Sequence, residues 1–197
     1  MAMDLVFANR LLASFTDQAI TTSEMALVAR ARTGDQQAFE ALVRQYRNRV
    51  LNLARRIVSD ADAAQDVVQE TFIKAYQQLP RFRGKSKFGT WLYRIAVNEA
   101  RGHLRAQHRR QARWEKHGAL EAAQPVPPEV GEQAGPIVAL LQELPEKQRI
   151  ALALFYLQEL SVAEIAQAVR APTGTVKAWL SRGRQRLREL AQERGLL

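Results

Sequence analysis

The stretch SVAEIAQAVRAPTGTVKAWLSRGRQRL, residues 161–187, decides the fold of the carboxy-terminal third, because it predicts two short helices joined by a tight turn. Ser161 and Glu164 have the spacing of a capping box, which satisfies the free amides at a helix start. Pro172 marks the second start, since a proline in a first helical turn loses no intrahelical hydrogen bond. The second helix is heavily basic, as is typical of a helix-turn-helix that reads DNA.

That second helix has two predicted faces. Val176, Leu180, Gly183 and Leu187 share the apolar face, and polar or basic residues lie near the opposite side. A helix in the major groove presents short polar or long basic side chains to base edges and phosphates. Lys177 and Arg182 are the preferred contacts in the predicted set, which is Thr173, Gly174, Lys177, Ala178, Ser181, Arg182 and Arg184.

Two features of the same helix leave alternatives open. The arginines further along, Arg184, Arg186 and Arg188, either contact DNA or form a solvated helix face. Trp179 is expected to pack against the edge of the domain, with a position along the DNA backbone as the alternative.

Composition limits the class of protein. The chain has 197 residues, 47% of them hydrophobic, which is enough for one large or two small domains. Its 29 Lys and Arg against 20 Asp and Glu give a formal charge of +9, and their clustering favours a nucleic-acid partner over a merely solvated surface. The absence of cysteine excludes disulfides and thiolate metal sites. Apolar runs too short for a bilayer, and an amino terminus without a signal pattern, lead us to expect a cytoplasmic protein.

The rest of the chain predicts an all-α fold, because helix-forming residues recur at helical spacing and no segment alternates as a strand does. A first helix is expected from Thr21 or Thr22, with Glu24 completing a capping box, to a stop at Gly34. Asp35 is predicted to cap a long second helix. A third is expected over residues 62–79, and its apolar stripe is Val67, Val68, Phe72, Ile73 and Tyr76.

A basic loop, PRFRGKSKFG at residues 80–89, follows the third helix. Thr90 is predicted to cap a fourth helix that continues into an arginine-rich tail. Phe82 and Phe88 are expected to be exposed because they lie in the loop, whereas Trp91 and Tyr93 are expected in the core.

The chain is predicted to form two helical domains. Residues 118–136 contain four prolines, three glutamates and no basic residue, which indicates an extended acidic linker. The predicted organisation is an amino-terminal extension (1–20), a helical domain (21–113), a linker (114–136) and a second helical domain (137–197).

Two blocks of sequence resemble extracytoplasmic-function sigma factors of the sigma-70 family. They are DVVQETFIKAYQQL from residue 66 with RFRGKSKFGTWLYRIAVNEAR up to residue 101, and LPEKQR from residue 144 with the helix-turn-helix. The resemblance covers about residues 24–192 apart from the linker. It implies a promoter-specificity subunit, with sigma region 2 in the first domain and region 4 in the second. Such a protein binds core RNA polymerase, recognises the minus-35 element with region 4, and recognises and opens the minus-10 element with region 2.

The resemblance assigns minus-10 contacts to the basic loop and the fourth helix. Opening a base step costs a few kcal/mol, so unstacked bases have to be captured on aromatic surfaces and the exposed backbone held by cations. The loop would hold a flipped base, Asn98 would contact the neighbouring duplex, and arginines would follow phosphates. The residues implied are Phe82, Arg83, Gly84, Lys85, Ser86, Lys87, Phe88, Asn98, Arg101, Arg105 and Arg109.

The resemblance also implies protein partners: the clamp of the largest polymerase subunit, the flap of the second, and an anti-sigma factor. Asp66, Gln69 and Glu70 would bind the clamp. The family pattern Asp-Ala-Glu-Asp is replaced here by Ala-Ala-Gln-Asp at residues 63–66, so two expected charges are missing. Carboxylates near this helix start are alternatively helix caps. The acidic linker would thread toward the RNA exit channel, or it is a simple tether.

No feature of the sequence indicates an enzyme, a cofactor or a metal site. His103, His108 and His117 do not share a helical face, and no carboxylate cluster accompanies them. The competing hypothesis is a stand-alone helix-turn-helix repressor or activator, which would bind duplex DNA by itself as a dimer. A structure-specific nucleic-acid enzyme would need a carboxylate metal site, which the sequence does not offer.

Overall fold

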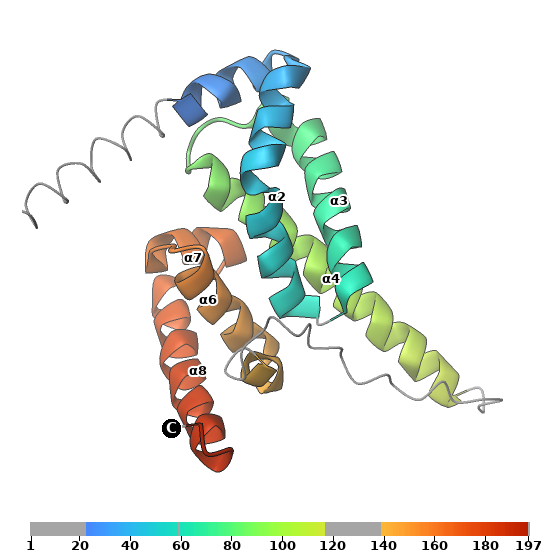
Figure 1. Ribbon diagram of the computed structural model, residues 1–197, viewed down its shortest axis with the longest axis vertical. Helices are drawn as coiled ribbons and strands as arrows, with labels where there is room; N and C mark the ends of the chain where they lie inside the picture. Colours follow the sequence, from blue (N-terminus) through green and yellow to red (C-terminus); the bar gives the residue numbers. More distant parts are fainter. Residues whose placement is uncertain (1–22, 59, 117–138, 197) are drawn as a thin grey trace, which may run out of the picture.

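The computed structural model describes residues 23–58, 60–116 and 139–196, and within these ranges all regular structure is helical (Figure 1). A helix at residues 23–32 precedes α2 (Gln36–Val58), α3 (Ala61–Gln78), a 3-10 turn η1 (Leu79–Arg81) and α4 (Phe88–Lys116). Most of the predicted linker lies outside the described residues. From residue 139 on come a second 3-10 turn, η2 (Leu141–Glu143), α6 (Glu146–Leu157), α7 (Val162–Val169) and α8 (Thr173–Glu193). The predicted all-α fold is confirmed.

The first two helix boundaries follow from local chemistry. Gly34, at φ +96°, ends the first helix in a conformation that favours glycine. Asp35 then caps α2, because its Oδ1 accepts the Ala38 amide at 3.0 Å. This hydrogen bond, with one from Arg30, lowers the pKa of the Asp35 carboxyl. The capping box expected at Thr21 or Thr22 lies outside the described residues.

Helix α3 begins one residue earlier than predicted. Its cap is Asp60, whose Oδ1 accepts the Ala63 amide at 2.6 Å. Ala63 and Ala64 are buried, so alanine at these positions lets the start of the helix approach its neighbours closely. One carboxylate near this helix start is therefore a helix cap.

The fourth helix differs more from its prediction. It begins at Phe88, so Thr90 lies inside the first turn, buried, and does not cap the helix. Phe82 and Phe88 are buried as well, at 8% and 3% exposure, so the prediction that they are exposed is wrong. The reason is a cluster with Trp91, whose ring centroid lies 5.0 Å from that of Phe82 and 5.5 Å from that of Phe88. Trp91 and Tyr93 are in the core, as predicted.

The first helix of the helix-turn-helix, α7, begins as predicted, with a capping box formed by Ser161 and Glu164. The Ser161 hydroxyl accepts the Glu164 amide, and the Glu164 carboxylate accepts the Ser161 amide at 2.9 Å. Helix α7 ends at Arg170, in the left-handed conformation at φ 56°. Pro172 stands immediately before α8 as its N-cap, one position earlier than a first-turn proline.

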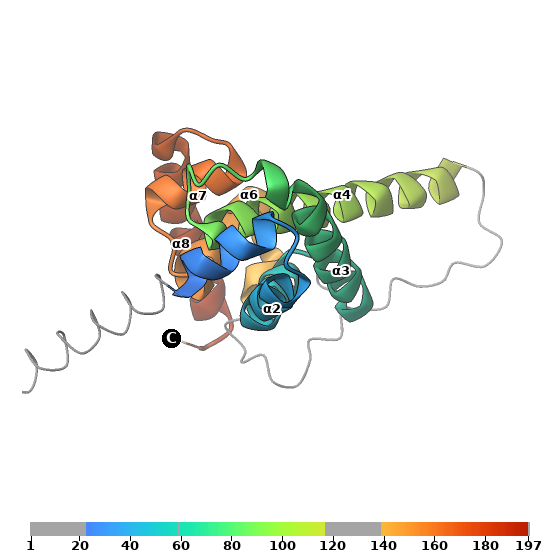
Figure 2. The ribbon, with the colours of Figure 1, turned by 90° about the horizontal axis from the view of Figure 1, so that it is seen from above.

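The two helical units pack directly against each other: α6 lies on α2 and α7 lies on α4 (Figures 1 and 2). Side-chain amides carry part of this contact. Gln142 donates to the backbone carbonyl of Arg55 at 3.1 Å, and Gln158 donates to that of Arg49 at 3.2 Å. Among the described residues, no helix has the length and apolar character needed to cross a membrane.

Two glycines of α8 offer a matched test of this packing. A Cβ at Gly183 would lie 2.9 Å from Leu152 Cδ1 and 3.3 Å from Gln148 Cβ, whereas a Cβ at Gly174 would meet nothing within 4 Å. Both Gly→Ala changes gain helix propensity of up to about 1 kcal/mol, but only Gly183→Ala overpacks the α6–α8 contact, at about 1–3 kcal/mol. We expect Gly183→Ala to be the less stable variant in urea unfolding. Equal stability of the two variants would contradict this packing.

Candidate nucleic-acid and protein interfaces

Helix α8 presents the predicted reading residues on its outer side. Val176, Leu180 and Gly183 are buried against the rest of the unit. Of the seven predicted residues, Ala178 is half-buried, and six are exposed: Thr173, Gly174, Lys177, Ser181, Arg182 and Arg184. The arrangement is thus one buried seam and one polar, basic surface free to enter a groove.

Two neighbours of this surface are engaged within the protein. Trp179 is half-buried and packs against the core, with Lys147 Nζ 5.9 Å from its ring centroid, which agrees with the expected position at the domain edge. Arg186 pairs with Glu189 at 3.3 Å and with Glu193 at 3.5 Å. This pairing favours the solvated helix face for Arg186.

In the structure, the non-helical part of the basic loop is residues 82–87, and its exposed polar residues lie over the buried rings of Phe82 and Phe88. Arg83, Gly84, Lys85 and Lys87 are exposed and Ser86 is half-buried. Gly84 has φ +68°, so the tip of the loop requires a conformation that glycine adopts without strain. Because Phe82 and Phe88 lie beneath the loop, their function in this structure is to hold it rather than to offer free stacking surfaces.

Helix α4 carries the remaining predicted cations. Asn98, Arg105 and Arg109 are exposed, as expected for contact with a nucleic acid. Arg101 is different, because its Nε donates to Glu146 Oε1 of α6 at 2.8 Å. Lys87 of the basic loop likewise pairs with Glu164 of α7 at 3.1 Å. Two predicted nucleic-acid cations are therefore bound by carboxylates of the second unit, which sequence reasoning missed.

The Glu164 carboxylate links local and tertiary structure. Burial raises its pKa, but hydrogen bonds from the Ser161 amide and hydroxyl and from Lys87 outweigh this, so the net pKa lies below the ordinary 4.5. The same carboxylate completes the capping box of α7 and holds the basic loop.

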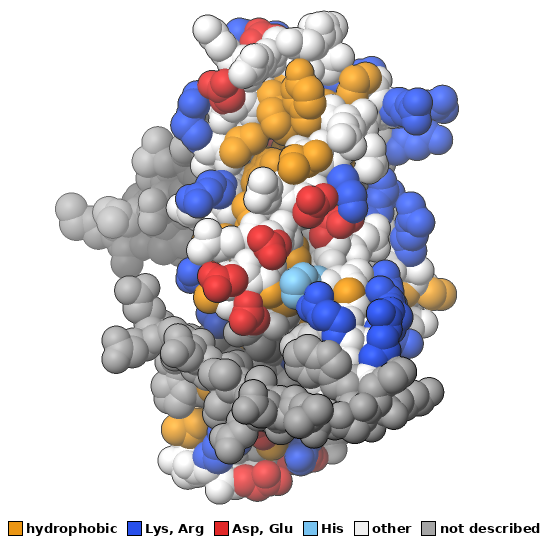
Figure 3. All heavy atoms as spheres, turned by 90° about the vertical axis from the view of Figure 1, so that its right-hand side faces the viewer, with side chains coloured by type: hydrophobic (Ala, Val, Ile, Leu, Met, Phe, Trp, Pro, Cys, Tyr) orange, Lys and Arg blue, Asp and Glu red, His pale blue; other side chains and the backbone are white. Residues whose placement is uncertain are grey.

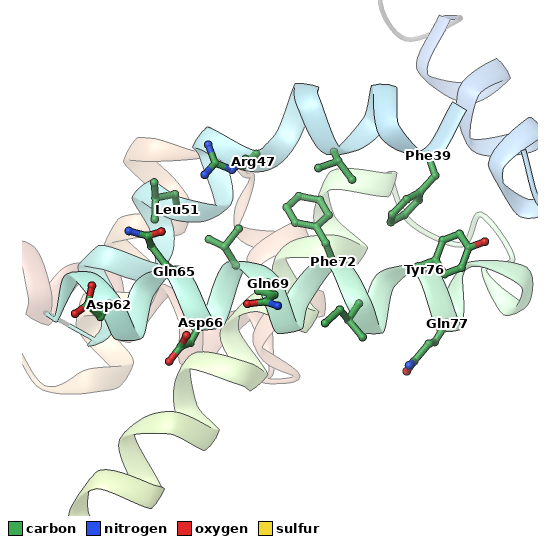
Figure 4. Close-up of a pocket in the computed structure, with 13 residues that line it drawn as sticks. Phe39, Arg47, Leu51, Asp62, Gln65, Asp66, Gln69, Phe72, Tyr76 and Gln77 are labelled. Atoms are coloured by element: carbon green, nitrogen blue, oxygen red, sulfur yellow. The ribbon is translucent and has the colours of Figure 1, made fainter. Parts of the chain in front are cut away.

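A groove runs between α2 and α3, with a volume of about 840 Å³ (Figure 4). Apolar side chains line one part of it, and Phe39 and Tyr76 meet edge to face with ring centroids 5.0 Å apart. Polar side chains line the rest, and they are Arg47, Asp62, Gln65, Asp66, Gln69 and Gln77. Figure 3 shows the hydrophobic side chains gathered on this side of the molecule with acidic side chains next to them.

Only some of the residues predicted to bind the polymerase clamp line this groove. Asp66 and Gln69 line it, and Glu70 is exposed without lining it. Ile73 and Tyr76, which the sequence places in the apolar stripe of the third helix, are 42% and 48% exposed. In the sequence, the apolar stripe of this helix is wider than one buried face needs. Such a stripe indicates that part of the apolar surface is left for a partner.

Known proteins match this architecture. A family model for sigma-70 region 2 matches residues 42–110, and one for sigma-70 region 4 matches residues 134–187. The RNA polymerase sigma-H factor of Pseudomonas aeruginosa is 39% identical over 178 residues, which cover 84% of this chain and 92% of that protein. The ECF RNA polymerase sigma-E factor of Escherichia coli K12 is 42% identical over 175 residues, covering 83% of this chain and 91% of that protein.

Solved structures agree with the sequence matches. CnrH in complex with the cytosolic domain of CnrY superposes with a TM-score of 0.66 at 25% identity, covering 87% of this chain and 98% of that one. The sigma factor RpoE in complex with the anti-sigma factor NepR from Bartonella quintana superposes with a TM-score of 0.65 at 26% identity. This match covers 78% of this chain and 96% of that one.

The chain therefore belongs to the extracytoplasmic-function group of the sigma-70 family. It is a promoter-specificity subunit of RNA polymerase, whose partners are core polymerase and promoter DNA. The resemblance seen in the sequence is confirmed, and sigma factors are non-catalytic initiation factors.

Glu164→Gln tests the contribution of its charge. Glutamine still fits a capping box, so the change removes the ionisable group while leaving the cap in place. A carboxylate whose pKa is lowered on folding stabilises the protein above its ordinary pKa, and this stabilisation is lost as pH falls through the lowered value. We expect Glu164→Gln to be less stable than the wild type at about pH 7 and to lose less stability below about pH 4.5 in urea unfolding.

Glu189→Gln, which removes a carboxylate from an exposed pair on α8, is the matched control. It should follow the wild-type pH profile. An identical profile for Glu164→Gln and the wild type would contradict the role given to Glu164.

Proposed function

We propose that the exposed face of α8 reads the minus-35 element, that the basic loop and α4 hold the minus-10 element, and that the α2–α3 groove binds the polymerase clamp. The observation that carries the first assignment is the exposed surface around Lys177, Ser181 and Arg182, opposite the buried residues Val176, Leu180 and Gly183. Polar and basic side chains on the outer side of a helix suit the donor and acceptor pattern of the major groove.

The minus-10 assignment is supported by the cations around the basic loop. Arg83 and Lys85 are exposed on the loop, and Arg105 and Arg109 are exposed along α4. A separated strand is held by contacts of this kind to its phosphates, together with pockets for unstacked bases. Phe82 and Phe88 contribute by fixing the loop from beneath.

The groove suits a helical partner with basic residues. Ile73 and Tyr76 offer an exposed apolar strip, and Asp62 and Asp66 place carboxylates farther along the same groove. A partner helix could bury apolar side chains on the strip while pairing its cations with the carboxylates. The apolar strip compensates for the two charges that are absent at residues 63–66.

The remaining assignments extend the family membership. We propose that the two domains are residues 21–113 and 137–197, that the protein acts in the cytoplasm without catalytic activity of its own, and that an anti-sigma factor restrains it. The last point is supported by a structural neighbour, RpoE, which was solved with the anti-sigma factor NepR.

Transcription from a promoter library with purified chain and core polymerase tests the function as a whole. Promoter-dependent initiation should exceed that of core polymerase alone. Absence of such initiation, together with specific dimeric binding to a palindrome, would instead indicate a stand-alone regulator.

Arg182→Ala tests the minus-35 assignment. Loss of a base contact costs about 1–3 kcal/mol, so promoter recognition should fall about fivefold or more while core binding stays unchanged. Arg188→Ala is the control, because it removes an equal charge from an exposed position nearer the carboxy end of α8. Footprinting on the holoenzyme measures promoter recognition, and a titration with core polymerase measures core binding. Equal loss of core binding in Arg182→Ala would contradict the assignment.

Ile73→Asp tests the groove. Placing a charge on the apolar strip should weaken core binding at least about tenfold, because the charge would be buried by the partner. Met25→Asp, a change of the same kind at a side chain 68% exposed outside the groove, should leave core binding unchanged. Equal affinities of the two variants for core polymerase would remove the groove from the interface.

A further inference from the structure

A hollow of about 540 Å³ lies where the basic loop and the start of α4 face the turn of the helix-turn-helix. The first unit contributes Lys85, Thr90 and Arg94 to its lining, and the second contributes Arg170 and Pro172. In Figures 1 and 2, α7 lies beside the start of α4, which is the place where the hollow forms. Neither unit could form it alone.

The charge in this hollow is all of one sign. Three cations line it and no carboxylate does. Burial, followed by the proximity of the Arg170 charge, lowers the pKa of the Arg94 guanidinium, so the two guanidinium groups are close enough to repel each other. In the described part of the chain neither forms an ion pair, and Glu164, on the nearby helix α7, is already bound to Lys87 and Ser161.

A buried hydroxyl provides an independent observation. Thr90 is 2% exposed, and its Oγ1 is buried without a hydrogen-bond partner in the described structure, although the residue lines the hollow. A buried hydroxyl without a partner costs free energy, and a bound ligand with acceptor oxygens would remove that cost. Thr90 therefore brings a hydroxyl without a partner to the lining of the hollow.

The backbone adds to the positive potential. Thr90 lies in the first turn of α4, and Pro172 is the N-cap of α8, so two helix starts border the hollow. Neither helix has an acidic residue in its first turn. Helix amino termini carry partial positive charge, so both reinforce the three cations.

We propose that this hollow is a phosphate-binding site, and that its ligand bridges Arg94 of the first unit and Arg170 of the second. Guanidinium groups bind phosphate oxygens through paired charge-assisted hydrogen bonds, and an anion between the two would convert their repulsion into attraction. The phosphate belongs either to a small free polyphosphate or to a nucleic-acid backbone.

Such a ligand would hold the two units together. This consequence rests on the proposed function: the basic loop and the start of α8 border the hollow, so a free polyphosphate would restrain both promoter-reading elements at once. A backbone phosphate would instead make the hollow part of the DNA path.

Calorimetric titration of the full chain with inorganic triphosphate at low salt tests the site. We expect binding of one triphosphate per chain, weakened about tenfold or more by Arg94→Gln and by Arg170→Asn. Asparagine is chosen at residue 170 because it tolerates the left-handed backbone found there. Thermal unfolding without ligand checks that both variants fold.

Arg188→Ala is again the matched control. Residue 188 lies about 22 Å along α8 from its start, and the change removes the same charge outside the hollow. Its affinity for triphosphate should stay within about twofold of the wild type. Failure of the wild type to bind, or equal weakening by all three variants, would overturn the site.

A second arm identifies the source of the phosphate. A short single-stranded oligonucleotide that competes with triphosphate and depends on both Arg94 and Arg170 would support a backbone phosphate. Oligonucleotide binding that is independent of Arg170, with triphosphate binding that requires it, would support a free polyphosphate.

Parallel transcription assays on the wild type distinguish failure of the phosphate site from failure of the proposed sigma-factor function. Initiation without triphosphate binding overturns the phosphate site alone, and triphosphate binding without initiation overturns the function alone.

Discussion

The ring of Tyr46 is the contact on which the first helical unit depends. It packs edge to face with Phe88 at 5.3 Å and with Tyr93 at 6.2 Å, while its hydroxyl donates to Glu24 at 2.5 Å. A Cβ at Gly89 would lie 3.0 Å from this ring, so the start of α4 can approach α2 because residue 89 has no side chain. One aromatic side chain thereby ties together the first helix, α2 and the base of the basic loop. Burial, followed by the hydrogen bond to Glu24, raises the pKa of the Tyr46 hydroxyl.

The features that the sequence predicts correctly are those with local causes. The capping box of Ser161 and Glu164, the cap at Asp35 and the stop at Gly34 each depend on residues within a few positions of one another. The faces of α8 follow in the same way from helical periodicity. Helix caps, helix ends and helix faces can therefore be predicted from the sequence, because all the residues that determine them lie in one short segment.

The features that the sequence misses have partners far along the chain. The sequence places Phe82 and Phe88 in a loop, but both are buried because Trp91 packs on Phe82 and Tyr46 packs on Phe88. Arg101 binds Glu146, which lies 45 residues away. Ile73 continues an apolar stripe and yet is exposed, since periodicity gives the direction of a face but not how much of it a neighbour covers. The hollow between the units has the same origin, because its two sides come from different halves of the chain.

The contacts of Lys87 and Arg101 with Glu164 and Glu146 have a consequence for the thermodynamics of promoter binding. In this packed state the two cations already have counter-charges within the protein. Transferring them to DNA phosphates requires breaking those two ion pairs. Added salt screens the pairs and so makes them easier to break. Added salt also weakens DNA binding, because binding releases counterions from the DNA. The two effects oppose each other, so the apparent number of phosphates neutralised will be smaller than the number of basic side chains that touch the DNA.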